Sequence, residues 1–183
     1  MARILALTSR LPYPPREGHQ LRAWHVLKAL ASRHEVTLLS FLRKDDALGQ
    51  AGPLRDVLAR LETFPIASEH SHASMAGALL RGTSTRTPFL VAKYDSAALR
   101  RRLAELARDA DLVHFDMLPL MAHVDCVPAG VPVTFNAHNV EHHLLAKRAQ
   151  IEPRLAARVF LASQVSRLQA FERRACQRAD AIL

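Results

Sequence analysis

The sequence is poor in cysteine and in aromatic residues, and it lacks long apolar runs. Cys126 and Cys176, the only two cysteines in 183 residues, match no metal-binding spacing and argue against a disulfide-stapled secreted domain. Aromatic residues make up 5% of the chain, which disfavours a base-stacking platform for nucleic acid. No apolar run approaches the roughly 20 residues that span a bilayer, and no signal peptide is recognisable. These absences predict a cytoplasmic protein with reduced thiols.

Lysine is also scarce, although the chain is basic. Lysine and arginine together number 25 against 17 acidic residues, a formal charge of +8, and only four of the 25 are lysine. Arginine binds phosphate and carboxylate through two parallel N–H donors, so this bias favours anionic partners. A high-GC genome enriches arginine and alanine together and explains the same bias without any ligand. The charge alone does not choose among nucleotides, nucleic acid and acidic lipid.

The first 42 residues alternate between strand and helix patterns. Residues 3–9 form a short apolar run typical of a buried strand, and a proline-rich loop follows at residues 11–18. After Gly18 the apolar residues recur at helical spacing, and Glu35–Leu42 reads as a second strand. This βαβ unit predicts parallel pairing of the two strands.

The same alternation continues to the end of the chain. We expect helices at 46–62, 75–80, 95–109, near 118–124 and at 153–178, with strands at 63–67, 112–115 and 131–135, and the opening of a further strand at 179–183. This order predicts a Rossmann-like, three-layer α/β/α fold with a mostly parallel sheet, formed by residues 1–183 as one domain. The strand at the very end leads us to expect a fragment of a longer protein.

Ligands of such sheets bind beyond the carboxyl ends of the strands, which makes the residues there candidates for a site. They are Ser9, Arg10, Tyr13 and Gly18 after the first strand, Asp116 after the fourth, and Asn136, His138 and Glu141 after the fifth. Arg10, and Arg22 in the following helix, could bind a phosphate or an acidic ligand, but Arg22 could equally be a solvated helix residue. Asp116 could accept hydrogen bonds from ligand hydroxyls or cap the helix that follows it.

His138, Glu141 and His142 also spell H-x-x-E-H, a pattern found in some zinc proteases. Two helical ligands four residues apart require a helix already formed at the first histidine, whereas His138 follows a strand closely. We therefore expect no metal, and His138 either projects into a cleft or packs under the next helix. Glu141 could orient His138, bind a hydroxyl or favour the first turn of a helix. His142 and His143 are expected to be ordinary helix-surface residues.

Three segments resemble the N-terminal half of a GT-B glycosyltransferase. They are EGHQLRAWHVLKALASRHEVTLLSF, ADLVHFD and GVPVTFNAHNVE, in that order along the chain. The resemblance is to the large retaining family (family four) that includes sucrose, mannosyl and lipopolysaccharide-core transferases. HNVE after the fifth strand is similar to a bacterial exopolysaccharide subgroup of that family.

The resemblance implies an acceptor-binding domain that faces a C-terminal nucleotide-sugar domain, which is missing from this chain. The complete enzyme would move a hexose from a nucleotide-sugar to a glycan or lipid-linked acceptor with retention, without a tightly bound metal, and this chain alone would be inactive. His138 would act near the reaction centre, and Gly18 would lie in the donor-phosphate loop. The acceptor would contact Arg10, Tyr13, Arg22, Asp116 and Glu141. Members often carry two adjacent glycines in that loop, where this chain has Glu17-Gly18.

Other interpretations remain open. A non-catalytic basic α/β module that binds nucleic acid or a nucleotide would fit the net charge, and a complete small nucleotide-binding protein is a third alternative. Under the glycosyltransferase interpretation we expect no nucleic acid partner. The arginines at 100–102 in the basic helix at 95–109 are either a solvated face or a patch that attracts anionic lipid at the inner face of the plasma membrane.

Overall fold

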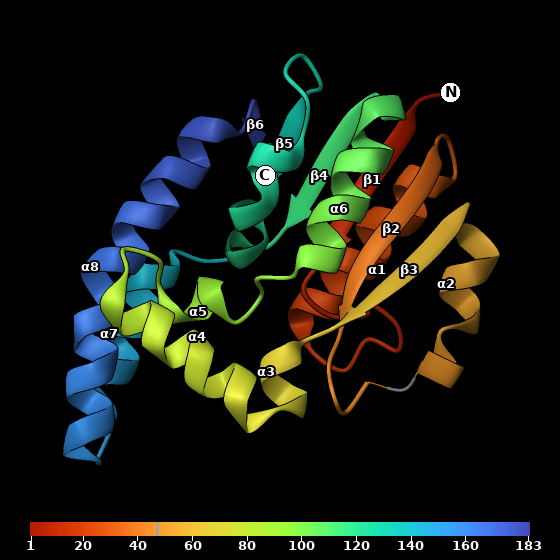
Figure 1. Cartoon of the computed structure of the whole chain (residues 1–183). Helices are drawn as coiled ribbons and strands as arrows, with labels where there is room; N and C mark the ends of the chain where they lie inside the picture. The colour runs from red at the N-terminus through yellow and green to blue at the C-terminus, as the bar shows by residue number, and fades with distance from the viewer. Residues whose placement is uncertain (47) are drawn as a thin grey trace.

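In a computed structural model, which describes residues 1–46 and 48–183, six parallel strands form one sheet in the order β3-β2-β1-β4-β5-β6 (Figure 1). The strands are β1 (Arg3–Thr8), β2 (Glu35–Leu42), β3 (Arg60–Pro65), β4 (Leu112–Asp116), β5 (Val133–Phe135) and β6 (Ala181–Ile182). The α-helices are α1 (Gly18–Ala31), α2 (Gly52–Val57), α3 (Ala67–His70), α4 (His72–Ser84), α5 (Phe89–Ala92), α6 (Ala97–Leu106), α7 (Glu141–Ile151) and α8 (Leu155–Arg178). Three 3-10 helices are η1 (Leu48–Gln50), η2 (Ala107–Asp109) and η3 (Leu118–Cys126). The Rossmann-like expectation is confirmed, with every strand parallel.

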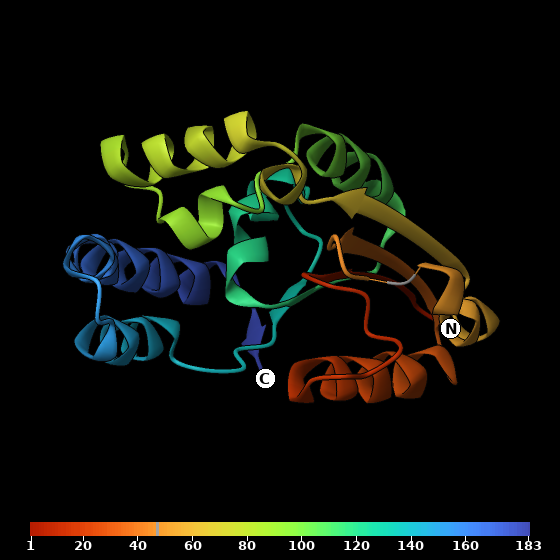
Figure 2. The ribbon, with the colours of Figure 1, turned by 90° about the horizontal axis from the view of Figure 1, so that it is seen from below.

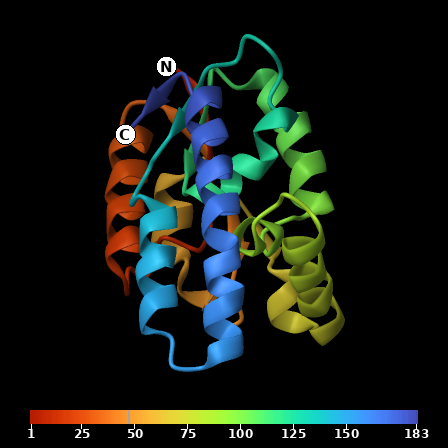
Figure 3. The same ribbon diagram turned by 90° about the vertical axis from the view of Figure 1, so that its left-hand side faces the viewer.

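Helices cover both faces of the sheet (Figure 2). Side chains alternate along β1, so Ile4 and Ala6 pack against α1 and α2 on one face, while Leu5 and Leu7 meet the larger core on the other. That larger core contains Phe41, Phe115 and Phe135 of the sheet, together with residues of α6, η3 and α8. Helices α7 and α8 lie side by side beyond the β5–β6 edge (Figure 3).

The segment from residue 46 to residue 67 differs from its expected structure. In place of one long helix there is η1, the short helix α2, and a strand that begins at Arg60 rather than at residue 63; residue 47 lies outside the described residues. Leu54, Leu58 and Leu61 stand at near-helical spacing and all pack in the α1-side core, but Leu61 does so from β3. Parallel pairing with β2, which joins Thr37 to Arg60, overrides the local helical periodicity.

Other helices and strands also differ in their bounds from the predicted ones. Helix α4 is longer than the predicted 75–80 segment and begins after Ser71, whose hydroxyl accepts a hydrogen bond from the backbone N–H of Ser74 at 3.3 Å. Pro153, expected in the first turn of the last helix, lies instead in the link between α7 and α8. The expected final strand pairs with β5, joining Thr134 to Ala181. Cys126 and Cys176 are free thiols, as predicted.

Helices α4 and α5 are held against α8 by a buried glutamine. The side chain of Gln164 donates to the carbonyl oxygen of Gly82 at 3.0 Å and accepts from the backbone N–H of Phe89 at 2.9 Å. Gly82 is close to Phe89 because it has no side chain: a Cβ built there lies 2.9 Å from both Cα and Cβ of Phe89. The approach of α4 to α5 therefore depends on a glycine at position 82.

Replacing Gly82 with alanine is expected to lower the free energy of unfolding by about 1–3 kcal/mol, because the added methyl group forces backbone apart. The matched control is Gly77→Ala in the same helix, where a Cβ meets no atom within 4 Å. Alanine there should stabilise the helix by about 0.5–1 kcal/mol. Urea unfolding of both variants measures the difference, and equal stabilities would contradict the close α4–α5 contact.

Candidate functional site

The order of the strands reverses between β1 and β4, and the carboxyl ends of these two strands and of β5 carry the candidate residues. In parallel α/β sheets the connections leave on opposite sides at such a point and leave room for a ligand. Register places Thr8 of β1 beside Asp116 of β4, and the backbone N–H of Asn136 continues the β5 pairing by donating to Phe115. The tertiary structure thus brings three segments of the chain to one edge.

Asp116, Asn136 and His138 form a hydrogen-bonded group at this edge. One oxygen of Asp116, Oδ1, accepts from Asn136 Nδ2 at 2.6 Å and lies 3.0 Å from His138 Nε2. Because a carboxylate oxygen only accepts, His138 carries its proton on Nε2, which leaves Nδ1 as the acceptor nitrogen. Asp116 therefore orients the imidazole and sets its tautomer, rather than capping η3, whose N-terminal flanking residue is Met117.

This group has an unused polar atom. Asn136 is 1% exposed, and its side-chain oxygen Oδ1 has no hydrogen-bond partner among the residues that the structure describes. A buried carbonyl oxygen without a partner costs free energy, which is the local cost of placing this amide against Asp116. The other polar atom of this amide, Asn136 Nδ2, lies 3.4 Å from His138 Nε2.

His138 lies at the strand tip, as expected, but its side chain is only 8% exposed. The ring of His19, in the first turn of α1, meets it edge-on with ring centroids 6.4 Å apart. Burial lowers the pKa of His19, and the nearby Glu17 carboxylate offsets part of that shift. His19, which was not among the predicted site residues, is therefore a neighbour of His138.

Arg10 is engaged within the protein. Its three guanidinium nitrogens donate to Glu17 at 2.9 Å, Asp45 at 2.9 Å and Asp46 at 2.6 Å, and its side chain is 5% exposed. Four basic side chains of the same two segments, Arg10, Arg16, Arg43 and Lys44, accompany these three carboxylates, so no net negative charge builds up there. Arg10 thus orders this loop, because each of its guanidinium nitrogens donates to a carboxylate of the protein rather than to a ligand.

The other predicted contacts of the first loop are spread along it. Tyr13 is half-buried, with its ring 5.2 Å from that of Trp24. Arg22 is exposed on α1. Gly18 is exposed at the first residue of α1, and a Cβ there would meet nothing within 4 Å, so space does not demand a glycine. Of this set, only the start of α1 adjoins His138, through His19.

Glu141 is the first residue of α7. Its backbone N–H donates to Glu172 of α8 at 2.9 Å, and burial raises the pKa of its carboxyl group, with a smaller contribution from the charge of Glu172. It lines an apolar pocket of about 410 Å³ between α5, α7 and α8. Glu141 thus lines that pocket and does not hydrogen-bond to His138, whose Nε2 contacts Asp116.

His142 is not the surface residue that the sequence suggested. Its Nδ1 contacts Glu172, and its side chain is 15% exposed, because α8 packs along this face of α7. His143 is exposed. The members of H-x-x-E-H consequently diverge, since His138 turns to Asp116 and His142 to Glu172. Among residues 1–46 and 48–183, no group of three or more histidine, cysteine, aspartate or glutamate side chains is placed to hold a metal.

The basic helix is largely paired with acids. Arg102 binds Glu62 at 2.9 Å and Glu105 at 2.6 Å, while Arg100 binds Asp95 at 3.1 Å; Arg101 is exposed. Fewer free charges therefore face solvent than the sequence suggests. No helix in the described part of the chain is long and apolar enough to cross a membrane.

Several contributors to the site were missed because their roles depend on contacts that are distant in sequence. Asp45 and Asp46 lie more than 30 residues from Arg10, and Glu172 lies about 30 residues from Glu141 and His142. His19 carried a usable signal, because it directly follows Gly18 at the same sheet edge. Comparison of the sequence with protein-family models and with curated proteins gives no match. The fold and the side-chain geometry therefore carry the functional argument.

Proposed function

We propose that this chain is the acceptor-binding domain of a retaining GT-B glycosyltransferase, of the exopolysaccharide type that its sequence resembles. Together with a nucleotide-sugar domain it would move a hexose to a hydroxyl group of a glycan or lipid-linked acceptor. The observation that carries the proposal is the Asp116–Asn136–His138 group at the carboxyl edge, next to the point where strand order reverses.

The chemistry of this group suits a sugar hydroxyl. His138 Nδ1 can accept the hydroxyl proton while Asp116 holds the opposite nitrogen. A neutral acceptor nitrogen of this kind matches a hydroxyl group better than it matches phosphate, which binds to N–H donors. The role of this domain would be to place the acceptor hydroxyl in line with the donor sugar.

Backbone NMR of the 183-residue chain tests acceptor binding directly. We expect hexose oligosaccharides to shift the amide signals of His19, Asp116, Asn136 and His138 in a saturable way, with dissociation constants in the millimolar range. Asn136→Ala should weaken binding about fivefold or more, because it removes the amide that donates to Asp116 and so loosens the orientation of His138. The control, Ser163→Ala, changes an exposed polar side chain on α8.

Two outcomes would contradict the proposal. One is the absence of saturable shifts at these residues with every oligosaccharide. The other is micromolar or tighter binding of DNA or RNA that weakens steeply with salt, which is the behaviour of a basic nucleic-acid module.

A further inference from the structure

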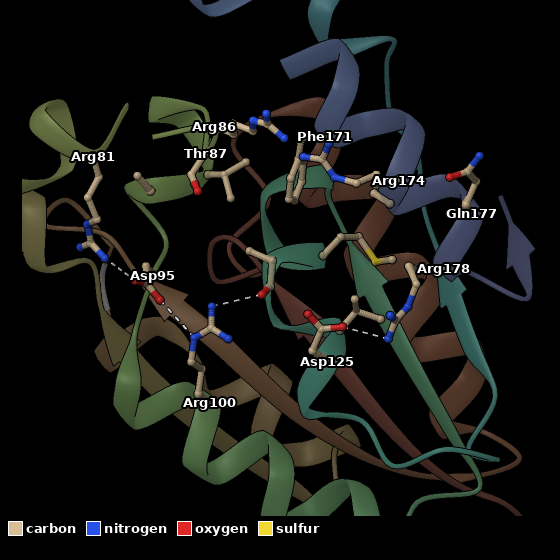
Figure 4. Close-up of a pocket in the computed structure, with 16 residues that line it drawn as sticks. Arg81, Arg86, Thr87, Asp95, Arg100, Asp125, Phe171, Arg174, Gln177 and Arg178 are labelled. Carbon is tan, nitrogen blue, oxygen red and sulfur yellow. Dashed lines mark hydrogen bonds and ion pairs between the residues drawn. The ribbon is translucent and has the colours of Figure 1, made fainter. Parts of the chain in front are cut away.

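A second pocket, of about 460 Å³, lies between the α4–α5 connection, η3 and the C-terminal part of α8 (Figure 4). It shares no lining residue with the Asp116–Asn136–His138 group or with the first loop. Its size is that of pockets that bind small molecules. The site already described does not account for it.

The walls of this pocket are rich in arginine. Its charged lining residues are five arginines and two aspartates: Arg81, Arg86, Arg100, Arg174 and Arg178, with Asp95 and Asp125. Both carboxylates are occupied: Asp95 is shared by Arg81 and Arg100, and Asp125 pairs with Arg178 at 2.9 Å. Burial alone would raise the pKa of Asp95, but hydrogen bonds from Arg100 and Arg81 outweigh it and hold that pKa below its usual value.

The remaining two arginines are left without an acid. Among the residues that the structure describes, Arg86 and Arg174 make no ion pair and no side-chain hydrogen bond. Figure 4 shows their guanidinium groups directed toward each other at the rim, beside the ring of Phe171. Two like charges held at one opening, with no carboxylate between them, create a local positive potential that an anion relieves.

The interior of the pocket is apolar. Val91, Met121, Val124 and Ala175 are buried there, and Phe171 is half-buried. An inorganic anion would use the rim alone, whereas a molecule with an apolar or aromatic part would also cover these side chains. Arginine prefers phosphate because its planar fork matches two phosphate oxygens, and its flat face stacks on rings.

We propose that this pocket binds a phosphate ester of a small, partly apolar molecule, with the phosphate between Arg86 and Arg174 and the organic part against Phe171. A nucleoside diphosphate has this chemistry and approximate size. The same phosphate could belong to a soluble molecule or to a lipid headgroup. The proposal is independent of acceptor binding at the strand ends, because the two sites have no residue in common.

The test measures binding to the 183-residue chain by isothermal titration calorimetry and by vesicle co-sedimentation. The probes are uridine diphosphate, inorganic pyrophosphate and phosphatidylglycerol vesicles. We expect the double variant Arg86→Gln/Arg174→Gln to weaken binding of uridine diphosphate at least about tenfold, since two charge-assisted contacts are lost. The matched control is Arg33→Gln/Arg101→Gln, which removes two exposed charges elsewhere and should change affinity less than about twofold.

Each outcome bears on the proposal. Uridine diphosphate binding more tightly than pyrophosphate, with loss only in the Arg86/Arg174 variant, supports a soluble ester that uses the apolar interior. Binding of vesicles alone, with the same variant dependence, supports a lipid headgroup as the source of the phosphate. Absence of binding to all three probes at millimolar concentration overturns the proposal, and so does equal weakening by the control variant.

Discussion

If the chain has the proposed function, replacing His138 with alanine in the complete enzyme is expected to lower turnover at least about tenfold, since a positioned proton acceptor contributes that much or more. The physical reason is the arrangement at the end of β5, where Asp116 holds Nε2 at 3.0 Å and leaves Nδ1 for the acceptor hydroxyl. Steady-state assay with donor and acceptor, on this chain joined to the nucleotide-sugar domain that the proposal requires, measures the effect. The prediction depends on the proposed function.

Two further variants separate chemistry from structure. Asp116→Asn changes the acceptor of the Nε2 proton and should alter the pH profile of turnover as well as its magnitude. His25→Ala removes an exposed histidine from α1 and should leave turnover unchanged. Thermal unfolding of each variant shows whether the fold is retained. Near-normal turnover of a folded His138→Ala enzyme would give that residue a structural role only.

Acidification between pH 6.5 and 4 is expected to destabilise the protein by about 3 kcal/mol through His123 alone, because a pKa shift of one unit corresponds to about 1.4 kcal/mol. Burial lowers the pKa of His123 from 6.5 to about 4. Its Nε2 lies 3.0 Å from the Tyr94 carbonyl oxygen, and its buried Nδ1 has no partner among the described residues, so an added proton finds no acceptor. In this pH window the unfolded chain binds the proton and the folded chain does not, so stability falls as pH falls.

Urea unfolding at pH 7 and at pH 4.5 measures this loss. His123→Gln does not titrate and keeps an amide that can donate to Tyr94, so its stability should depend less on pH than that of the parent. Burial also lowers the pKa values of His19 and His114, so part of the pH dependence remains in the variant. His25→Gln, at an exposed position, is the control. An identical pH dependence of His123→Gln and parent would contradict the buried, neutral state of His123.

Apolar runs determined the central strands with little ambiguity. β1 and β2 lie on the predicted residues because their side chains are buried on both faces, which requires nearly continuous apolar sequence. The 46–62 segment could not be read the same way. Its leucines fit a helix, and only pairing with β2 assigns Leu61 to a strand.

Some features of the candidate site could likewise be predicted from the sequence, and others could not. His138 and Asp116 could be found because ligands of parallel sheets lie at strand ends, a rule that needs only the order of strands and helices. The engagement of Arg10 could not be found, since its partners Asp45 and Asp46 follow a different strand. The prediction that His142 is a helix-surface residue was wrong for a similar reason, because its partner Glu172 comes from another helix.

By itself, the sequence determined the alternation of strands and helices, the parallel sheet and the residues at its carboxyl edge, because these depend on local periodicity and on general rules of chain connection. Only the tertiary structure decided which charges are free. Arg10 and Arg102 are paired with acids that lie far along the chain, whereas Arg86 and Arg174 are brought together without one. An ion pair requires its nitrogen and oxygen within about 4 Å of each other, and only the folded chain sets that distance for residues far apart in sequence.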